Sequence, residues 1–242
     1  MSLISILRLE KKFYINKKPI YLFKNLNLSI YEKEFLVILG PNGVGKTTLL
    51  NIIAGLEEPT NGKVVINKKE LQKNMGIIFQ EFSLFPWKTV IKNVLVGLEI
   101  KGINKKKANN LALKYLKLLN LLKFKNEYPY KLSAGMKQKV AVARALTVDP
   151  KILLMDEPFA NLDVHTKKIL QEEIIKLWKK TKKTVIYVTH DIEEALLMAT
   201  RIVLLGKKGV IKKIIKIKDN SHRNLSSDYF YKINQEIKRR LI

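Results

Sequence analysis

The chain has 242 residues, of which 47% are hydrophobic, and a formal net charge of +25. This apolar content can form a buried core and excludes a chain that is disordered throughout. Because the sequence has no cysteine, disulfides, iron–sulfur clusters and a thiol nucleophile are excluded as well.

The positive charge comes from 40 lysines and only six arginines. Specific nucleic-acid sites favour arginine, whose planar fork binds bases and phosphates through two hydrogen bonds. A lysine excess spread along the whole chain is more typical of solvated faces. We therefore expect attraction to anionic surfaces without specific nucleic-acid binding. The sequence has no apolar run of the roughly 18 residues that cross a bilayer and no secretion-signal pattern, so we expect a soluble, intracellular protein.

In chain order, residues 22–40 are rich in strand formers, and the apolar run 35–39 predicts a strand covered on both faces. Gly40 ends this strand, and helical spacing follows over residues 47–54. Strands alternating with helices indicate a parallel sheet with helices on both faces. Further buried strands are expected at 151–155, 184–189 and 201–205, a strand-like segment at 76–79, and helices at 164–180 and 191–199.

Residues 88–148 contain helix formers and no convincing strand, so we expect a helical subdomain there. Residues 1–87 and 149–206 should form the α/β core, with a small antiparallel β-subdomain on the N-terminal side. The segment 207–242 is a lysine-rich basic tail with alternating apolar residues over 211–217, and the polar part that follows is expected to be loosely held. The predicted fold class is α/β, as one domain over residues 1–242.

Residues 40–47 match the phosphate-loop pattern G-x-x-x-x-G-K-[ST]. Its glycines let successive backbone N–H groups turn toward a phosphate, and the following helix adds its positive end. Lys46 should reach the β- and γ-phosphates, and the Thr47 hydroxyl can bind Mg²⁺. The alternative is a tight turn without a ligand. The expected nucleotide-binding residues are Gly40, Pro41, Asn42, Gly43, Val44, Gly45, Lys46, Thr47 and Thr48.

Two adjacent carboxylates, Asp156 and Glu157, follow the predicted strand 151–155. In phosphate-loop NTPases an aspartate in this place holds Mg²⁺, which favours Asp156 for that role. Glu157 would then lie near the γ-phosphate and polarise a water molecule. The alternative is that Asp-Glu-Pro starts a surface turn.

Residues 132–137 read Leu-Ser-Ala-Gly-Met-Lys, and Ser133 is by itself a good helix N-cap. With the two preceding motifs, this segment resembles the LSGGQ signature of the ATP-binding subunits of ABC transporters. The resemblance spans about residues 3–206 and implies a phosphate-loop ABC ATPase that binds ATP and Mg²⁺. Ala134 and Met136 depart from the signature, so a nucleotide-binding scaffold with degraded catalysis is one alternative.

The resemblance also implies roles for single residues. Gln80 would touch Mg²⁺ or the attacking water, and His190 would sense the γ-phosphate. Ser133 and Gly135 would meet the nucleotide held by a second copy of the chain, and Asp163 lies in the loop that passes between the copies. Phe13 aligns with the aromatic residue that stacks on adenine. Its neighbour Tyr14 is a rival for that role, and either could belong to the core.

Residues 84–93 and 189–195 look like those of importer subunits for nitrate, aliphatic sulfonates and taurine. This likeness implies a peripheral protein on the cytoplasmic face of the membrane. Its expected partners are a transmembrane permease, a second copy in an ATP-sandwich dimer, the membrane surface and, indirectly, a solute-binding protein. We expect the segment 82–93 to dock on the permease, although its aromatic residues could instead fill the base of the helical subdomain. The alternative function is an ABC ATPase that acts on nucleic acid or ribosomes without a permease.

Overall fold

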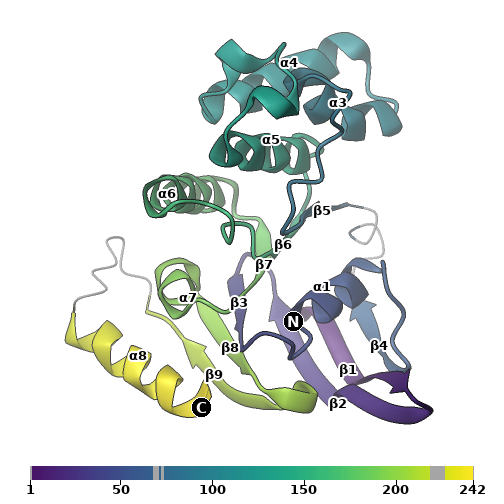
Figure 1. Cartoon of the computed structure of the whole chain (residues 1–242), viewed down its shortest axis with the longest axis vertical. Coiled ribbons are helices and arrows are strands. Elements are labelled where there is room, and N and C mark those ends of the chain that lie inside the picture. Colours follow the sequence, from purple (N-terminus) through teal and green to yellow (C-terminus); the bar gives the residue numbers. More distant parts are fainter. Residues whose placement is uncertain (1, 68–70, 72–73, 219–226, 242) are drawn as a thin grey trace. The chain divides into compact units, whose positions relative to one another are not determined.

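The computed structural model describes residues 2–67, 71, 74–218 and 227–241. The chain forms two compact units, which are described separately below (Figure 1). One unit comprises Met1–Lys73 and Lys182–Ile242, and the other comprises Asn74–Thr181. None of the helices among the described residues is long and apolar enough to span a membrane.

An antiparallel sheet at the N-terminus belongs to the first unit. Its strands are β1 (Ser2–Ile15), β2 (Lys18–Tyr31) and β4 (Asn61–Ile66), in the order β2-β1-β4. Asn16 and Lys17 join β1 to β2 with positive φ angles of 48° and 61°, as a tight two-residue hairpin turn requires. The sheet confirms the predicted antiparallel β-subdomain.

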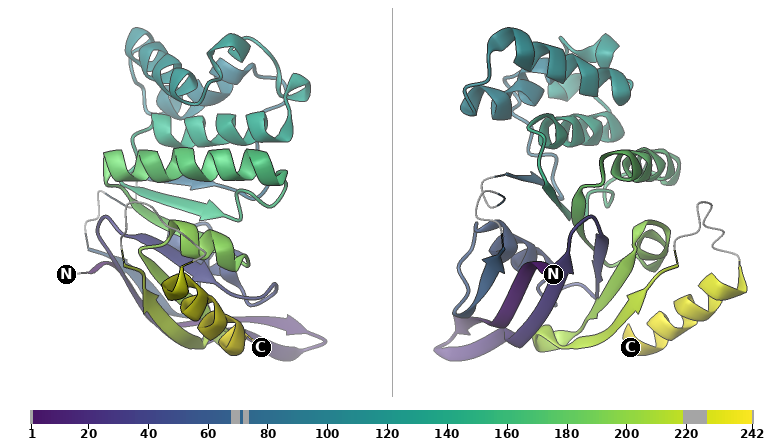
Figure 2. Two further views of the ribbon diagram at one scale, coloured as in Figure 1. Left: turned by 90° about the vertical axis from the view of Figure 1, so that its left-hand side faces the viewer. Right: turned by 180° about the vertical axis from the view of Figure 1, so that it is seen from behind.

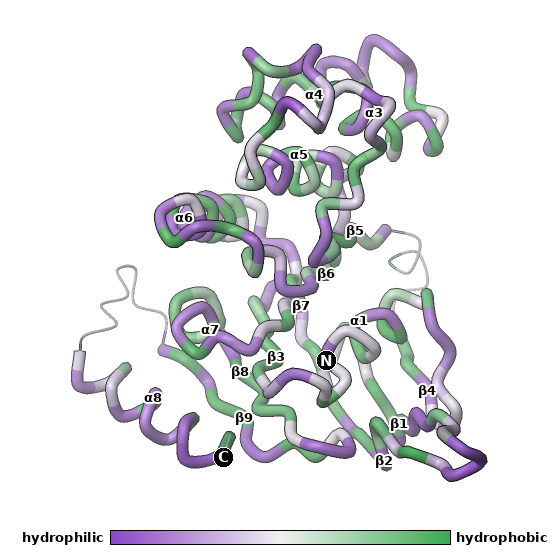
Figure 3. Tube along the Cα trace, in the orientation of Figure 1, coloured by the Kyte–Doolittle hydropathy of each residue, from purple (hydrophilic) through white to green (hydrophobic). Residues whose placement is uncertain are grey.

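Three buried parallel strands form the centre of the same unit. They are β3 (Phe35–Leu39), β7 (Thr184–Thr189) and β8 (Arg201–Leu205), and every one of their residues is buried. Figure 3 shows them as hydrophobic stretches of the trace. Helices α1 (Lys46–Ala54) and α7 (Ile192–Met198) lie on opposite sides of these strands (Figure 1). The continuous apolar runs therefore predicted these strands correctly, because both of their faces are covered.

The C-terminal segment is more ordered than the sequence indicated. Strand β9 (Ile211–Lys216) pairs antiparallel with β8, and helix α8 (Asp228–Leu241) buries Phe230, Ile233 and Ile237. The expectation that the polar part of the tail is loosely held was wrong for α8. A lysine-rich segment can still be held when its few apolar side chains share one face. Residues 219–226 and 242 of the predicted tail lie outside the described residues.

The second unit is mainly helical. Strands β5 (Met75–Ile78) and β6 (Ile152–Asp156) pair in parallel. Helix α5 (Ala134–Thr147) lies between α6 (Val164–Thr181) and the pair formed by α3 (Val90–Ile100) and α4 (Lys105–Leu118), as Figure 2 shows. Short 3₁₀ turns at Leu122–Phe124 and Pro129–Lys131 connect α4 to α5. Residues 88–148 contain no strand, as expected, while the subdomain bounds stay a prediction.

Candidate functional site

The loop between β3 and α1 has the conformation that a phosphate needs. Gly43 and Gly45 have φ angles of 79° and 96°, which a residue with a side chain adopts only with strain. Lys46 is 5% exposed, and its ammonium group donates to the carbonyl oxygens of Gly40 at 3.0 Å and Pro41 at 3.1 Å. The first turn of α1 has no acidic residue that would offset its positive end. The loop therefore fits an anion such as a nucleotide phosphate.

The parallel pairing of β3 and β7 brings His190 beside the start of this loop. Leu39 is in register with Thr189, and the Gly40 amide donates to the Thr189 carbonyl at 3.3 Å. His190 follows directly and is exposed. Two segments that are 150 residues apart in the sequence thus end side by side at one sheet edge.

A buried network fixes the backbone on both sides of His190. The hydroxyl groups of Tyr187 and Thr189 both donate to Glu194 Oε2, the latter at 2.7 Å. Thr189 Oγ1 also accepts from the Asp191 amide at 3.1 Å, and Asp191 caps α7. Burial, followed by the neighbouring Glu194 carboxylate, raises the pKa of Tyr187 well above its usual value, so this hydroxyl remains a donor. These contacts restrict the position from which the imidazole of His190 extends.

In the second unit, the pairing of β5 and β6 places Gln80 near the two carboxylates. Ile78 is in register with Met155, so both strands end at the same edge. Asp156 is 5% exposed and Glu157 is half-buried, whereas Gln80 is exposed. Glu157 has a φ of 40°, a left-handed conformation that is strained for a glutamate. Such strain is typical of functional sites, and no local sequence pattern indicates it.

The signature segment begins α5, as predicted from the residues. Ser133 caps the helix by accepting from the Met136 amide at 3.3 Å. Gly135 is buried against Thr166 of α6, and a Cβ atom there would overlap the Thr166 methyl group. Ala134 is exposed, so a side chain is accommodated there. The close approach of the two helices therefore accounts for one glycine of the signature.

Asp163 starts α6 and lies close to the signature through Thr166. Its Oδ1 accepts from the Thr166 amide at 3.0 Å. Hydrogen bonds from the backbone and then the side chain of Thr166 lower the pKa of Asp163. The second unit therefore brings the signature and Asp163 together, through two helices that begin side by side.

Phe13 and Tyr14 both lie on β1 and are 45% and 64% exposed, so neither is a core residue. The contacts of Lys11 distinguish Phe13 from Tyr14. Its ammonium group lies 5.2 Å from the centre of the Phe13 ring and 3.0 Å from a carboxylate oxygen of Glu57, just beyond α1. Phe13 is therefore on the side of the sheet that faces the end of α1, and its role as the stacking residue stays a prediction.

The sequence matches the family described as ABC transporter over residues 23–160, which is more than half of the chain. The chain belongs to the ABC transporter family. An uncharacterized ABC transporter ATP-binding protein of Methanocaldococcus jannaschii is 47% identical over 97% of this chain and 89% of its own length. The nitrate import ATP-binding protein NrtD of Synechocystis is 38% identical, with 96% and 89% covered. The aliphatic sulfonates import ATP-binding protein SsuB of Bacillus cereus is 38% identical, with 97% and 94% covered.

A solved ABC cassette has the same fold. It is described as a dimeric, post-hydrolysis state bound to ADP and Pi, and it matches with a TM-score of 0.79 at 35% identity. The match covers 90% of this chain and 100% of the cassette. The chain is thus an ABC ATP-binding subunit with ATPase activity, and its fold is the predicted phosphate-loop α/β class.

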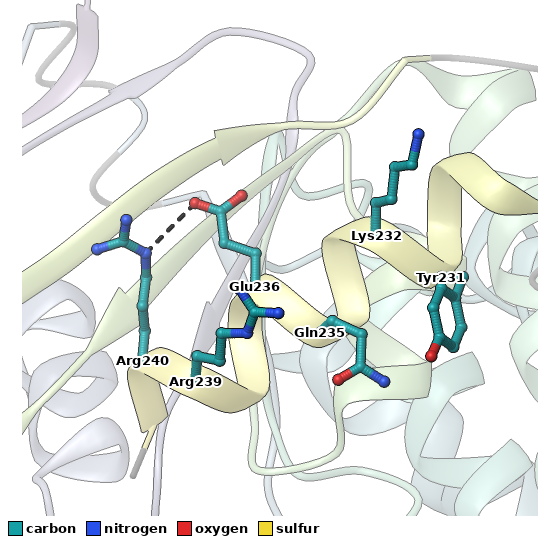
Figure 4. Close-up of a pocket in the computed structure, with 6 residues that line it drawn as sticks. All are labelled: Tyr231, Lys232, Gln235, Glu236, Arg239 and Arg240. Atoms are coloured by element: carbon teal, nitrogen blue, oxygen red, sulfur yellow. Dashed lines mark hydrogen bonds and ion pairs between the residues drawn. The ribbon is translucent and has the colours of Figure 1, made fainter.

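The outer face of α8 carries a hollow of about 450 Å³, which lies outside the predicted site (Figure 4). Lys213 first, and then Arg240, lower the pKa of Glu236 through hydrogen bonds, with N–O distances of 3.2 and 3.3 Å. Lys232 and Tyr231 extend to opposite sides of the helix in Figure 4. The side chains diverge instead of converging on one point, which is typical of a solvated face. Its lining residues are Tyr231, Lys232, Gln235, Glu236, Arg239 and Arg240.

Several contacts that shape the site were not predicted from the sequence. Glu194 accepts from Thr189, five residues earlier, and Thr166 packs on Gly135 of a different helix. Arg144 and Asn93 hold the segment after Gln80, as described below. Arg144 carried one usable signal, since it is one of only six arginines in a lysine-rich chain.

Proposed function

We propose that this chain is the ATP-hydrolysing subunit of an importer whose transmembrane permease is a separate protein. The proposal rests on two strand registers. In one unit the phosphate loop lies beside His190, and in the other Gln80 lies near two carboxylates. The names of the relatives favour a small oxyanion as cargo, such as nitrate or a sulfonate, a class that includes taurine.

The phosphate loop holds the nucleotide in this proposal. Lys46 and the backbone N–H groups of the phosphate loop contact the phosphates, and Phe13 stacks on the adenine. Thr47, Asp156 and Gln80 offer oxygen donors, the ligands that Mg²⁺ prefers. When bound, Mg²⁺ supplies positive charge that offsets the charge developing on the phosphates. The ammonium group of Lys46 suits the nucleotide phosphates, while the Thr47 hydroxyl at the start of α1 and the Asp156 carboxylate at the end of β6 suit the ion.

Glu157 and His190 carry the hydrolysis. The Glu157 carboxylate accepts a proton from water as the water oxygen attacks the γ-phosphorus, and the bond to the β-phosphate oxygen breaks to release ADP and phosphate. His190 donates a hydrogen bond to the γ-phosphate. The hydrogen bonds of Tyr187 and Thr189 to Glu194 orient His190. The positive φ of Glu157 ends the extended conformation of β6 just before this carboxylate.

A second copy completes each site in this proposal, and the solved cassette of similar fold, which is described as dimeric, supports such an assembly. Ser133 and Gly135 of one copy meet the nucleotide held by the other, and Asp163 lies in the loop between the copies. The intact Lys46, Asp156, Glu157 and His190 weigh against a scaffold with degraded catalysis.

The permease docks on the segment after Gln80. Residues 82–88, named here the aromatic loop, carry Phe82, Phe85 and Trp87, and Trp87 is 71% exposed. The rings of Phe85 and Trp87 lie 5.7 Å apart, and aromatic residues often contribute most of the binding energy at protein interfaces. Asn93, which we expected in this surface, is fully buried and belongs to its support. The subunit would then be peripheral on the cytoplasmic face, where its lysines favour an anionic leaflet.

The substitution Glu157→Gln tests the catalytic assignment. It keeps the shape of the side chain but removes the base, so turnover should fall by about 10²–10⁴-fold while ATP binding persists. ATPase assays and sizing with ATP, which should trap a dimer, measure both effects. Glu172→Gln, at an exposed position of α6, is the matched control. Turnover close to the wild type in Glu157→Gln would remove Glu157 from the base role.

The substitution Phe85→Ala tests the docking surface. If the ring docks a partner, the isolated subunit should remain folded and hydrolyse ATP but lose transport in the complex. If the ring is part of the core, its truncation should destabilise the isolated subunit by about 3–5 kcal/mol. A markedly lower melting temperature without the permease would remove Phe85 from the docking surface.

A further inference from the structure

The segment from residue 79 to residue 89, which contains the aromatic loop, has no regular secondary structure, yet the loop is held at both ends. At one end, Asn93 Oδ1 accepts from the Phe85 amide at 2.8 Å, and its Nδ2 donates to the carbonyls of Phe85, Lys88 and Thr89 at 2.9–3.1 Å. Asn93 belongs to α3, so this end of the loop is attached to the helix that follows it.

Arg144 holds the other end from a different helix. Its Nη1 donates to the Ser83 carbonyl at 2.6 Å, and its Nη2 donates to the Phe82 carbonyl at 3.3 Å. Its guanidinium lies 6.0 Å from the centre of the Phe85 ring. Ser83 has a φ of 48°, an unfavourable conformation for a serine, so a bond to its carbonyl offsets part of that cost.

The use of arginine at this position is itself informative. In a chain with 40 lysines and six arginines, lysine is the default cation. A lysine ammonium is a point charge on a flexible stem and does not reproduce a planar fork that bonds two carbonyls beside a ring. Arg201 in the other unit shows the same pattern. It binds both Glu34 oxygens at 2.7 and 2.9 Å and lies 4.9 Å from the Tyr31 ring.

Helix α5 connects this attachment to the signature. Arg144 lies in its last turn, whereas the signature occupies its first turn, where Gly135 packs on α6. A helix of 14 residues is about 21 Å long and moves as a rigid rod. We infer that Arg144 is a positioning residue that fastens the aromatic loop to α5, so that a permease bound at the loop moves the signature with it. This inference rests on the permease docking proposed above.

The test compares Arg144→Lys with Arg201→Lys in the full chain, because both variants keep the charge and lose a fork. Hydrogen exchange of the isolated subunit is followed over residues 82–90. Arg144→Lys should make exchange there about ten-fold faster, the factor expected for one lost hydrogen bond, and Arg201→Lys should leave it unchanged. If Arg144→Lys does not fold, Arg144→Gln, which retains one donor group, takes its place.

A second readout separates positioning from mere support. In proteoliposomes that contain the permease subunits co-purifying with the chain, uptake of nitrate and of an alkanesulfonate is measured per ATP hydrolysed. Arg144→Lys should keep the ATPase activity of the isolated subunit and lower uptake per ATP by about ten-fold, within the usual range of coupling between sites. Arg201→Lys should change neither quantity.

The substitution Trp87→Ala distinguishes a failure of the proposed docking surface from a failure of the inferred role of Arg144. If Trp87→Ala does not affect uptake, the proposed docking surface is wrong, and with it the inferred role of Arg144 in coupling. If Trp87→Ala abolishes uptake while Arg144→Lys couples normally, docking stands and the inference is overturned. Unchanged exchange over residues 82–90 in Arg144→Lys would also overturn it.

Discussion

Two carboxamide side chains in the helical unit are fully buried, and their surroundings differ completely. Asn93, at the base of the aromatic loop, makes four hydrogen bonds to backbone groups. Gln138, in α5 just after the signature, has no hydrogen-bond partner for either its oxygen or its nitrogen among the described residues. Both side chains are 0% exposed.

The difference distinguishes a region in which the buried amide is fully hydrogen-bonded from one in which it is not. A buried polar group with all its bonds fixes a conformation, whereas one without bonds costs free energy in that state. Native proteins keep such groups rarely, and often at functional positions. Gln138 lies three residues after Gly135, so the amide without a hydrogen-bond partner among the described residues belongs to the helix that begins at the signature.

Removal of the Asn93 amide should have the largest effect. Asn93→Leu keeps a similar size but leaves the Phe85 amide and three carbonyl groups without this partner. We expect a loss of about 3 kcal/mol in the free energy of unfolding, measured by urea denaturation. Asn110→Leu, at an exposed position of α4, is the control and should change stability by less than about 0.5 kcal/mol. Equal stability of the two variants would mean that the four bonds contribute little.

Gly135→Ala tests the packing beside Gln138. Its new methyl group would overlap the Thr166 methyl, so α5 and α6 must separate, at a cost of about 1–3 kcal/mol. Thr166→Ser removes the obstructing methyl but keeps the hydroxyl, so the double variant should recover most of the loss. A double-mutant cycle by thermal denaturation measures this coupling. Additive effects would show that the two side chains do not compete for space.

The sequence predicted the framework well because its signals are local. Continuous apolar runs identified β3, β7 and β8, and the capping residue Ser133 gave the start of α5. The signal failed at the C-terminus, where α8 is held by three apolar side chains among many charged ones. Local composition there resembles a loose tail, and only packing in the fold decides otherwise.

The candidate site was predictable as a set of motifs but not as an arrangement. The phosphate loop and the Asp156–Glu157 pair follow from local patterns, whereas the registers of β3 with β7 and of β5 with β6 depend on long-range pairing. Nothing near Asn93 or Arg144 in the sequence indicates that their partners are the carbonyls of the aromatic loop. Backbone groups carry no sequence signature, so contacts to them appear only in the structure.

Gln138→Leu should have a smaller effect of opposite sign. If the amide has no partner in the isolated subunit, an apolar side chain of similar size removes a desolvation cost and stabilises the fold by about 1 kcal/mol. Urea denaturation measures the change, and Gln138→Met tests an unbranched side chain in the same space. Destabilisation by both variants would show that the amide is already satisfied and would weaken the contrast with Asn93.

The smallest expected effect concerns the cap of α6 by Asp163, which lies beside the same helix pair. Its lowered folded-state pKa means that the carboxylate is favoured in the folded state. The resulting stability is present above the unfolded-state pKa and is lost as the pH falls through the folded-state pKa. Asp163→Asn keeps an acceptor oxygen but cannot titrate, so the wild type should exceed the variant in stability at neutral pH and lose that advantage in acid. Unfolding midpoints in urea across this pH range measure the difference. Because the carboxylate is exposed, the difference should be small, and a constant offset at every pH would mean that the charge of Asp163 has no part in the cap.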